Sequence, residues 1–143
     1  MKVITIMQPY AHLIATGAKR VENRTWPTSY RGPLLIHAGK SRQWLDDRNG
    51  IDDRYGIPIS DMEFGAVVAV ADLVQCASYG RIEMKDFDRE YPWLREHEHT
   101  EGPWCWVLAN VKRLANPIPA RGAQGLFDFP YCPDTSSEPT TDR

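Results

Sequence analysis

Side chains that could bind an anion or a base edge concentrate in one short stretch, residues 17–24 (GAKRVENR). Lys19 could neutralise a phosphate oxygen or a developing negative charge. Glu22 could accept hydrogen bonds from a base, as carboxylates do from the cytosine amino group. Arg24 could offer two parallel N–H bonds to phosphate or guanine, or could orient Glu22. The alternatives are an exposed turn lysine for Lys19 and, for Glu22, a cross-strand or same-face charge ladder worth only about 0.2–1 kcal/mol.

A second group of cations follows an apolar run. Lys40 and Arg42 flank Ser41, which we expect to cap a helix whose free N–H groups favour an anion. The local GKS is not a phosphate-binding P-loop, because Leu34 stands where that motif needs glycine. A contact to backbone phosphate remains a hypothesis for this group.

Aromatic residues could supply a stacking face for a base, a contact worth about 1–3 kcal/mol. Trp26 is the best candidate, since it follows the charged stretch closely. Trp104 and Trp106 lie in an apolar run, where aromatic residues are more typical of a core. The sequence therefore favours Trp26 for stacking and the other two for packing.

The four histidines do not predict a metal site. His97 and His99 alternate in an acidic segment without a third ligand at a fixed spacing. His12 and His37 are expected to be buried or half-buried partners in hydrogen bonds. We predict no metal and no cofactor.

Length and composition bound the class of protein. The chain has 143 residues, of which 42% are hydrophobic and 25% charged, which is typical of one globular domain. The net charge of −2 argues against a protein that binds nucleic acid through overall basicity. Residues 1–45 nevertheless carry a charge of +6, and residues 46–101 carry −8. A polyanion site should therefore come from the first third.

The location of the protein is also predicted. No apolar stretch approaches the roughly 18–20 residues that a bilayer crossing needs, and no export signal is recognisable. The three cysteines lack CxxC spacing, so we expect reduced thiols. A cytoplasmic protein without membrane contact is the expectation.

Hydrophobic periodicity and turn residues predict a mixed α+β architecture. The expected strands are residues 2–7, 20–24, 33–38, 64–76, 103–114 and 125–129. A helix is expected over 10–16 and another from Ser41. Residues 46–61 read as a helix end and loop, and residues 82–100 as a broken helix or loop. The tail, 133–143, is too polar to fold by itself.

Residues 17–24 match the GxKxxExR signature of ASCH domains, and the chain resembles that family more widely. Gln8-Pro9-Tyr10 precedes the signature, and GPLLIHAGK, GAVVAVADLV, PWCWVL and PIPARGAQGLF follow in the family's order. The resemblance covers about residues 3–129. It implies a PUA-like mixed β-barrel with two or three peripheral helices, an ASCH domain over 1–132 and a flexible tail over 133–143.

The resemblance also implies function. The family is generally proposed to bind RNA, and some members are reported as DNA binders, ribonucleases or small amidohydrolases. The resemblance implies a cleft beside the signature and suggests that Gln124 brings a polar amide to it. The similar amidohydrolases carry a threonine nucleophile three residues after the lysine, where this chain has Glu22. Covalent catalysis by that route is therefore not expected, although Glu22 could still activate water.

Two functions of different class remain open. The first is a binding module that holds a base or nucleotide of RNA, DNA or a nucleoside-like small molecule. Its predicted contacts are Lys19, Glu22, Arg24, Trp26, Lys40, Arg42 and Gln124. The second is a small hydrolase of RNA or modified nucleosides in which Lys19 and Glu22 are catalytic. A protein-interaction role for the acidic middle segment ranks lowest, because nothing marks a partner groove.

Overall fold

The structure is a computed structural model and describes residues 1–46 and 48–131. The strands are β1 (Lys2–Ile6), β2 (Val21–Arg24), β3 (Gly32–Ala38), β4 (Ile51–Asp52), β5 (Ile57–Pro58), β6 (Ala66–Ser78), β7 (Trp104–Pro119) and β8 (Phe127–Asp128). The helices are α1 (Tyr10–Ala15) and α2 (Tyr79–Glu83), with 3-10 turns η1 (Arg48–Gly50) and η2 (Ile59–Asp61). The mixed α+β class predicted from the sequence is confirmed.

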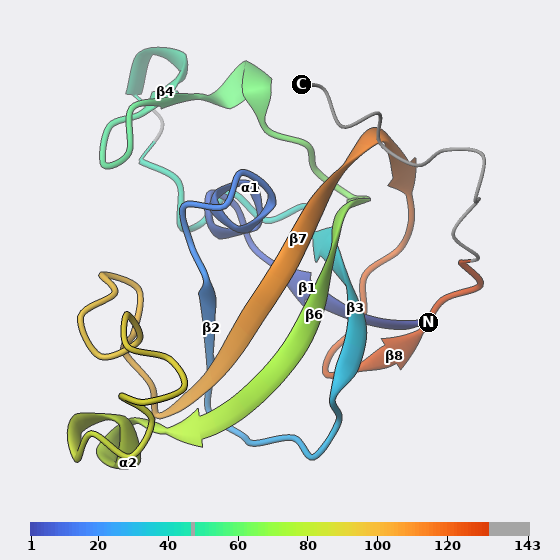
Figure 1. Cartoon of the computed structure of the whole chain (residues 1–143). Coiled ribbons are helices and arrows are strands. Elements are labelled where there is room, and N and C mark those ends of the chain that lie inside the picture. The colour runs from blue at the N-terminus through green and yellow to red at the C-terminus, as the bar shows by residue number, and fades with distance from the viewer. Residues whose placement is uncertain (47, 132–143) are drawn as a thin grey trace, which may run out of the picture.

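Six strands form one mixed sheet in the order β2-β7-β6-β3-β1-β8 (Figure 1). The β1–β3 pair is parallel, and the other neighbours are antiparallel. Within the described residues no ladder joins the two edge strands, β2 and β8, so the predicted closed barrel is not formed. The edge strands are short: β2 has four residues and β8 has two.

Two long central strands give the sheet its curvature. β6 has 13 residues and β7 has 16, and Figure 1 shows them running together across the molecule. Their pairing shifts register at three places. Such bulges bend a strand and increase its twist. The valine-rich run predicted as a strand over 64–76 forms most of β6.

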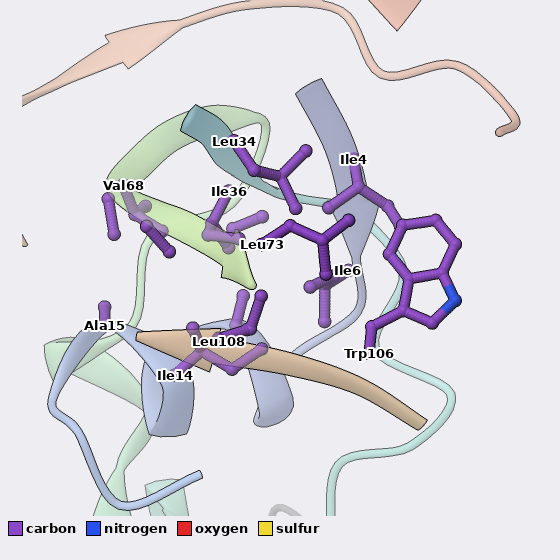
Figure 2. Close-up of a cluster of buried hydrophobic side chains, with 14 residues drawn as sticks. Ile4, Ile6, Ile14, Ala15, Leu34, Ile36, Val68, Leu73, Trp106 and Leu108 are labelled. Atoms are coloured by element: carbon purple, nitrogen blue, oxygen red, sulfur yellow. The ribbon is translucent and has the colours of Figure 1, made fainter. Parts of the chain in front are cut away.

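The main core lies between α1 and one face of the sheet. Figure 2 shows Ile4, Leu34, Leu73 and Trp106 converging from four strands, while Ile14 of α1 lies among the same apolar cluster. Trp106 is fully buried. Each large side chain of this kind contributes about 1.5–3 kcal/mol when removed from water. This cluster therefore fixes α1, and the turn that follows it, against the sheet.

The predicted helix at Ser41 is wrong. The Ser41 hydroxyl accepts the N–H of Gln43 at 3.3 Å, and the segment is a turn. Serine competes with helix in this way by bonding to the backbone two residues on. The expected loop over residues 46–61 also contains the small β4–β5 hairpin. The acidic stretch after β6 forms only α2, followed by turns.

The predictions for the domain end at residue 132 and for the tail over 133–143 lie outside the described residues. In the part of the chain that is described, no helix is long and apolar enough to cross a bilayer.

Candidate functional site

A cleft of about 390 Å³ opens beside α1 and the start of β2. It is lined by Thr5, Ile6, Met7, Tyr10, Lys19, Glu22, Asn23, Arg24, Trp44, Tyr55, His99 and Glu101. These residues come from β1, α1, β2, the segment that carries β4 and β5, and the segment after α2. Figure 1 shows those last two segments on the β2 side of the sheet. A smaller cavity of about 130 Å³ lies elsewhere on α1, near His12 and Arg113.

The turn between α1 and β2 delivers Lys19 to this cleft. Gly17 ends the helix with φ of 89°, a left-handed conformation that glycine adopts without strain. The N–H of Lys19 then donates to the carbonyl of Leu13 at 3.0 Å, which fixes the turn. Lys19 is only 3% exposed, and its Nζ lies 3.7 Å from Oε1 of Glu22. A cation is therefore held at the buried end of the cleft.

Strand periodicity puts Glu22 and Arg24 on one face of β2. Oε2 of Glu22 lies 2.9 Å from Nη2 of Arg24, and that guanidinium also donates to the carbonyl of Thr5 at 2.8 Å. The Nε of Arg24 is buried and has no hydrogen-bond partner in the described structure. Glu22 thus lies between two cations, which hold its carboxylate in a fixed orientation.

Arg20 does not share this arrangement, although a strand was expected over residues 20–24. It lies before β2 and is exposed, with its guanidinium 3.6 Å from the ring centroid of Trp93. Its backbone N–H donates to Nε2 of His97 at 3.0 Å. Arg20 therefore anchors the segment after α2 instead of lining the cleft.

Asn23 ties that same segment to β2. Its Nδ2 donates to the carbonyl of His99 at 2.8 Å, and its Oδ1 accepts the N–H groups of Glu101 at 3.1 Å and Gly102 at 2.8 Å. One amide side chain therefore positions two residues of the cleft wall. We refer to Lys19, Glu22, Asn23 and Arg24 together as the floor of the cleft.

Burial lowers the pKa of one residue on the floor and of one residue in the neighbouring wall. Burial lowers the pKa of Lys19, and the Glu22 carboxylate opposes that shift. The Nζ of Lys19 also lies 5.4 Å from the ring centroid of Tyr10. The pKa of His99 is lowered by burial first and by the Lys19 charge second. His99 is 5% exposed, and its buried Nε2 has no hydrogen-bond partner in the described structure.

Exposed residues surround the opening. Met7, Trp44 and Glu101 line the cleft and are exposed, and we call these three the mouth. Trp44 is 50% exposed. Its carbonyl accepts a hydrogen bond from the guanidinium of Arg54, which also donates to the Tyr10 hydroxyl at 3.2 Å. The mouth is thus connected to the wall of the cleft through one arginine.

Of the residues predicted from the sequence, Lys19, Glu22 and Arg24 come together, and four others do not line the cleft. Trp26 packs edge-on against Trp106, with ring centroids 4.8 Å apart, on the core side. The exposed Lys40 lies against Gly65.

The guanidinium of Arg42 lies 4.7 Å from the ring centroid of Phe64. Gln124 is exposed, but the N–H of its neighbour Ala123 donates to Oγ1 of Thr5 at 3.3 Å. The Gln124 segment therefore borders the cleft wall.

Sequence reasoning missed several residues of the cleft. Tyr10, Trp44 and Tyr55 were not considered for stacking, and His99 was considered only as a metal ligand. In the described residues no group of three or more His, Cys, Asp or Glu side chains could hold a metal ion. The one available signal was Tyr10, which lies in the QPY segment just before the charged stretch.

Comparison with known proteins gives a family and a fold. The sequence model of the ASCH domain matches residues 4–118. Activating signal cointegrator 1 from Homo sapiens and that from Mus musculus are each 26% identical over 126 residues. Those matches cover 83% of this chain and 20% of each relative, so the chain spans about a fifth of their length.

Two crystal structures from Zymomonas mobilis, of an ASCH protein and of a serine-to-alanine variant, are similar in fold. Their TM-scores are 0.51 and 0.50, with identities of 16% and 18%. Each match covers 88% of this chain and 85% of the other.

Proposed function

The chain belongs to the ASCH domain family, and we propose that its cleft binds one nucleotide of a single-stranded nucleic acid, with RNA the preferred class. We also assign the fold to the PUA-like superfamily, with an open sheet in place of a closed barrel. The observation that carries the proposal is the convergence of Lys19, Glu22 and Arg24 on one concave site with aromatic walls.

The size of the cleft supports a ligand of one nucleoside unit. Its volume of about 390 Å³ is at the small end of the range for small-molecule sites, about 300–1,000 Å³. A base that belongs to a duplex must unpair and unstack before it can enter such a site. The free-energy cost of this step is smallest when the strand is already single. Single strands are also the usual target of sequence-specific RNA recognition, because their bases can be splayed out.

The chemistry of the floor supports recognition of a base edge. Lys19 offers N–H donors, and Glu22 offers acceptors only 3.7 Å away. This pair is complementary to an edge that carries an acceptor atom beside an amino or N–H group, as cytosine does with N3 beside its amino group and guanine does with O6 beside N1–H. Tyr10 and Tyr55, whose rings meet edge to face at 6.5 Å, line the same cleft. A base would therefore meet polar groups at its edge and apolar rings at its faces.

Fluorescence anisotropy titration tests the proposal with single-stranded RNA, single-stranded DNA and duplexes of one sequence over a range of salt concentrations. Single strands should bind more tightly than duplexes, and Lys19→Met should weaken binding by at least about tenfold, since a charge-assisted hydrogen bond is worth about 1.5–3 kcal/mol. Lys112→Met is the matched control, because Lys112 is exposed on β7 and does not line the cleft. Undetectable binding of all probes, or equal effects of both variants, contradicts the proposal.

A second candidate, a small hydrolase of RNA or of amide-bearing modified nucleosides, is favoured by the buried Lys19 beside Glu22. A lysine whose pKa is lowered by burial is a better base than an exposed one. Glu22 or Lys19 would take a proton from water as its oxygen adds to the amide carbonyl. The C–N bond then breaks, and the leaving nitrogen receives a proton.

Incubation with acetylated cytidine and with RNA oligonucleotides separates the two candidates. Turnover by wild type and by Lys112→Met that is lost in Lys19→Met supports the hydrolase. If Lys19→Met changes binding alone and no preparation turns over either substrate, the cleft is a binding site without catalysis.

A further inference from the structure

We propose that Trp44 stacks on the nucleotide adjacent to the one in the cleft, so that the preferred ligand is a continuous strand and not a free nucleoside. This inference rests on the proposed function and specifies the ligand of the same site. It replaces the stacking role that the sequence predicted for Trp26, whose ring packs against Trp106 in the core.

The exposed indole of Trp44 is the first observation. Trp44 lines the cleft and is 50% exposed, a high value for a tryptophan. Trp26, Trp93 and Trp106 each contact another aromatic ring. Across the described residues, no ring or cation contact involves the Trp44 indole. The exposed half of the residue is therefore open to a ligand.

The second observation is how Trp44 is held. Arg54 donates one hydrogen bond to the Trp44 carbonyl and another to the Tyr10 hydroxyl. The backbone N–H of Arg54 donates to Oδ1 of the fully buried Asp52 at 3.0 Å. Trp44 is thus fixed relative to the cleft wall through its backbone, while its indole stays unengaged. A stacking platform needs this combination of fixed position and free face.

The division of charge between floor and mouth is the third observation. Two cations, Lys19 and Arg24, lie on the floor, whereas the charged group of the mouth is the Glu101 carboxylate. A carboxylate does not attract phosphate, so among the three mouth residues the favourable contacts with a nucleotide come from the apolar Met7 and the aromatic Trp44. Lys40 and Arg42, two to four residues before Trp44, could contact the phosphates of a strand that leaves past the indole.

The size of the cleft completes the argument. A cleft of about 390 Å³ has room for about one nucleoside. Trp44 lines the exposed edge of that cleft, so a second base of the same strand would lie outside it and beside the indole. The next base of the strand then has Trp44 as its nearest aromatic partner. A free nucleoside has no second base to stack.

Isothermal titration calorimetry with cytidine 5′-monophosphate and with hexacytidylate RNA tests this inference. The variants are Trp44→Ala, Trp44→Phe and, as a matched control, Ile51→Ala. Ile51 is 42% exposed in the same segment and does not line the cleft. Trp44→Ala should weaken hexacytidylate binding about 5- to 150-fold, the range that corresponds to loss of one stacked base. It should change mononucleotide binding by less than about twofold. Trp44→Phe should recover most of the loss, and Ile51→Ala should match wild type.

Three outcomes overturn the inference. If Trp44→Ala weakens both ligands equally, Trp44 is a wall of the single-nucleotide cleft; if it weakens neither, it takes no part in binding. Either result leaves the proposed function standing. If wild type binds neither probe, the proposed function fails and the inference fails with it.

Discussion

The floor and the mouth of the cleft are built in opposite ways. Each charged group on the floor has partners: Glu22 lies between Lys19 and Arg24, and Arg24 also bonds to Thr5. The mouth depends on Trp44, which is half exposed and whose backbone carbonyl is held by Arg54. The floor stands on α1 and β2, whereas Trp44 precedes a hairpin of two-residue strands.

This difference predicts which substitutions should destabilise the fold. A buried ion pair contributes little net stability, but removing one partner leaves an uncompensated charge in a low-dielectric site. A half-exposed side chain that is bonded only through its backbone can be replaced at little cost to the fold. Substitutions on the floor should therefore change both ligand affinity and the free energy of unfolding, whereas substitutions in the mouth should change ligand affinity alone.

The largest expected effect comes from Glu22→Gln, which removes the carboxylate between two cations on the floor. Lys19 then stays buried with only the weaker influence of the Glu101 carboxylate to offset its charge. We expect the free energy of unfolding to fall by about 3–5 kcal/mol at pH 7, as for other broken buried pairs. Urea denaturation followed by circular dichroism measures it.

The matched control is Asp128→Asn, which breaks the exposed Lys2–Asp128 pair at 3.1 Å. That variant should lose no more than about 1 kcal/mol. Similar losses in the two variants would mean that the floor is solvated like a surface, and the distinction between floor and mouth would fail.

A smaller effect is expected for Asn23→Ala, which tests the link between the floor and the wall. The variant loses three hydrogen bonds to the backbone of residues 99–102. With a net value of about 0.5–1.5 kcal/mol for each bond, we expect a loss of about 2–3 kcal/mol. Thermal and urea unfolding measure it, and Asn116→Ala, an exposed site on β7, is the control. A loss no larger than that of the control would show that the wall does not depend on β2.

Acid should destabilise the floor side of the molecule and not the mouth. Burial lowers the pKa of both His97 and His99, so below about pH 6.5 the unfolded chain takes up more protons than the native one. Stability should change little just above that pH, around neutrality, and should fall as the pH drops through it, by at most about 1.4 kcal/mol per pH unit for one proton. His97→Gln should flatten the curve, because a glutamine oxygen can still accept the Arg20 N–H. Parallel curves for variant and wild type would exclude His97 as the titrating group.

The sequence predicted the floor better than the mouth, for a physical reason. The short turn after α1 and the two-residue repeat of β2 bring Lys19, Glu22 and Arg24 together through local geometry. The exceptions follow the same logic. Arg20 lies just before β2 and therefore outside its alternation of side chains. The helix predicted at Ser41 does not form, because the serine hydroxyl accepts a hydrogen bond from the backbone N–H two residues later.

The mouth and the wall depend on contacts between distant segments, which no local pattern reveals. Asn23 reaches residues 76 to 79 positions away, and Arg54 reaches Tyr10 across 44 positions. The mixed α+β class and the long strands were predictable from valine-rich runs. The open order of the sheet was not, because strand order is set by tertiary pairing. Trp26 and Trp44 show the same limit of sequence reasoning. Both are tryptophans close to cationic residues in the sequence, and only the tertiary structure shows that Trp26 packs against the core while Trp44 is exposed at the cleft.

The smallest effect on stability is expected for Arg54→Met, which removes the link between mouth and wall. Asp52 is fully buried, but it keeps the backbone N–H donors of Asp46, Arg54 and Tyr55 in the variant, so no buried carboxylate is left unpaired. The Arg54 side chain is 41% exposed and its contact with Asp52 is long, at 3.9 Å, so the free energy of unfolding should change by less than about 1 kcal/mol.

Binding should change more than folding in this variant, because Trp44 loses the bond that positions its backbone. Hexacytidylate affinity should fall several-fold, with mononucleotide affinity unchanged. The control is Arg81→Met, which breaks the exposed ion pair between Arg81 of α2 and Asp86. It should change neither the affinity for hexacytidylate nor the affinity for the mononucleotide. A stability loss above about 2 kcal/mol in Arg54→Met would place the mouth among the parts that hold the fold, since surface contacts do not reach that value. A small loss with weakened strand binding would mean that Arg54 acts by aiming the indole and not by supporting the core.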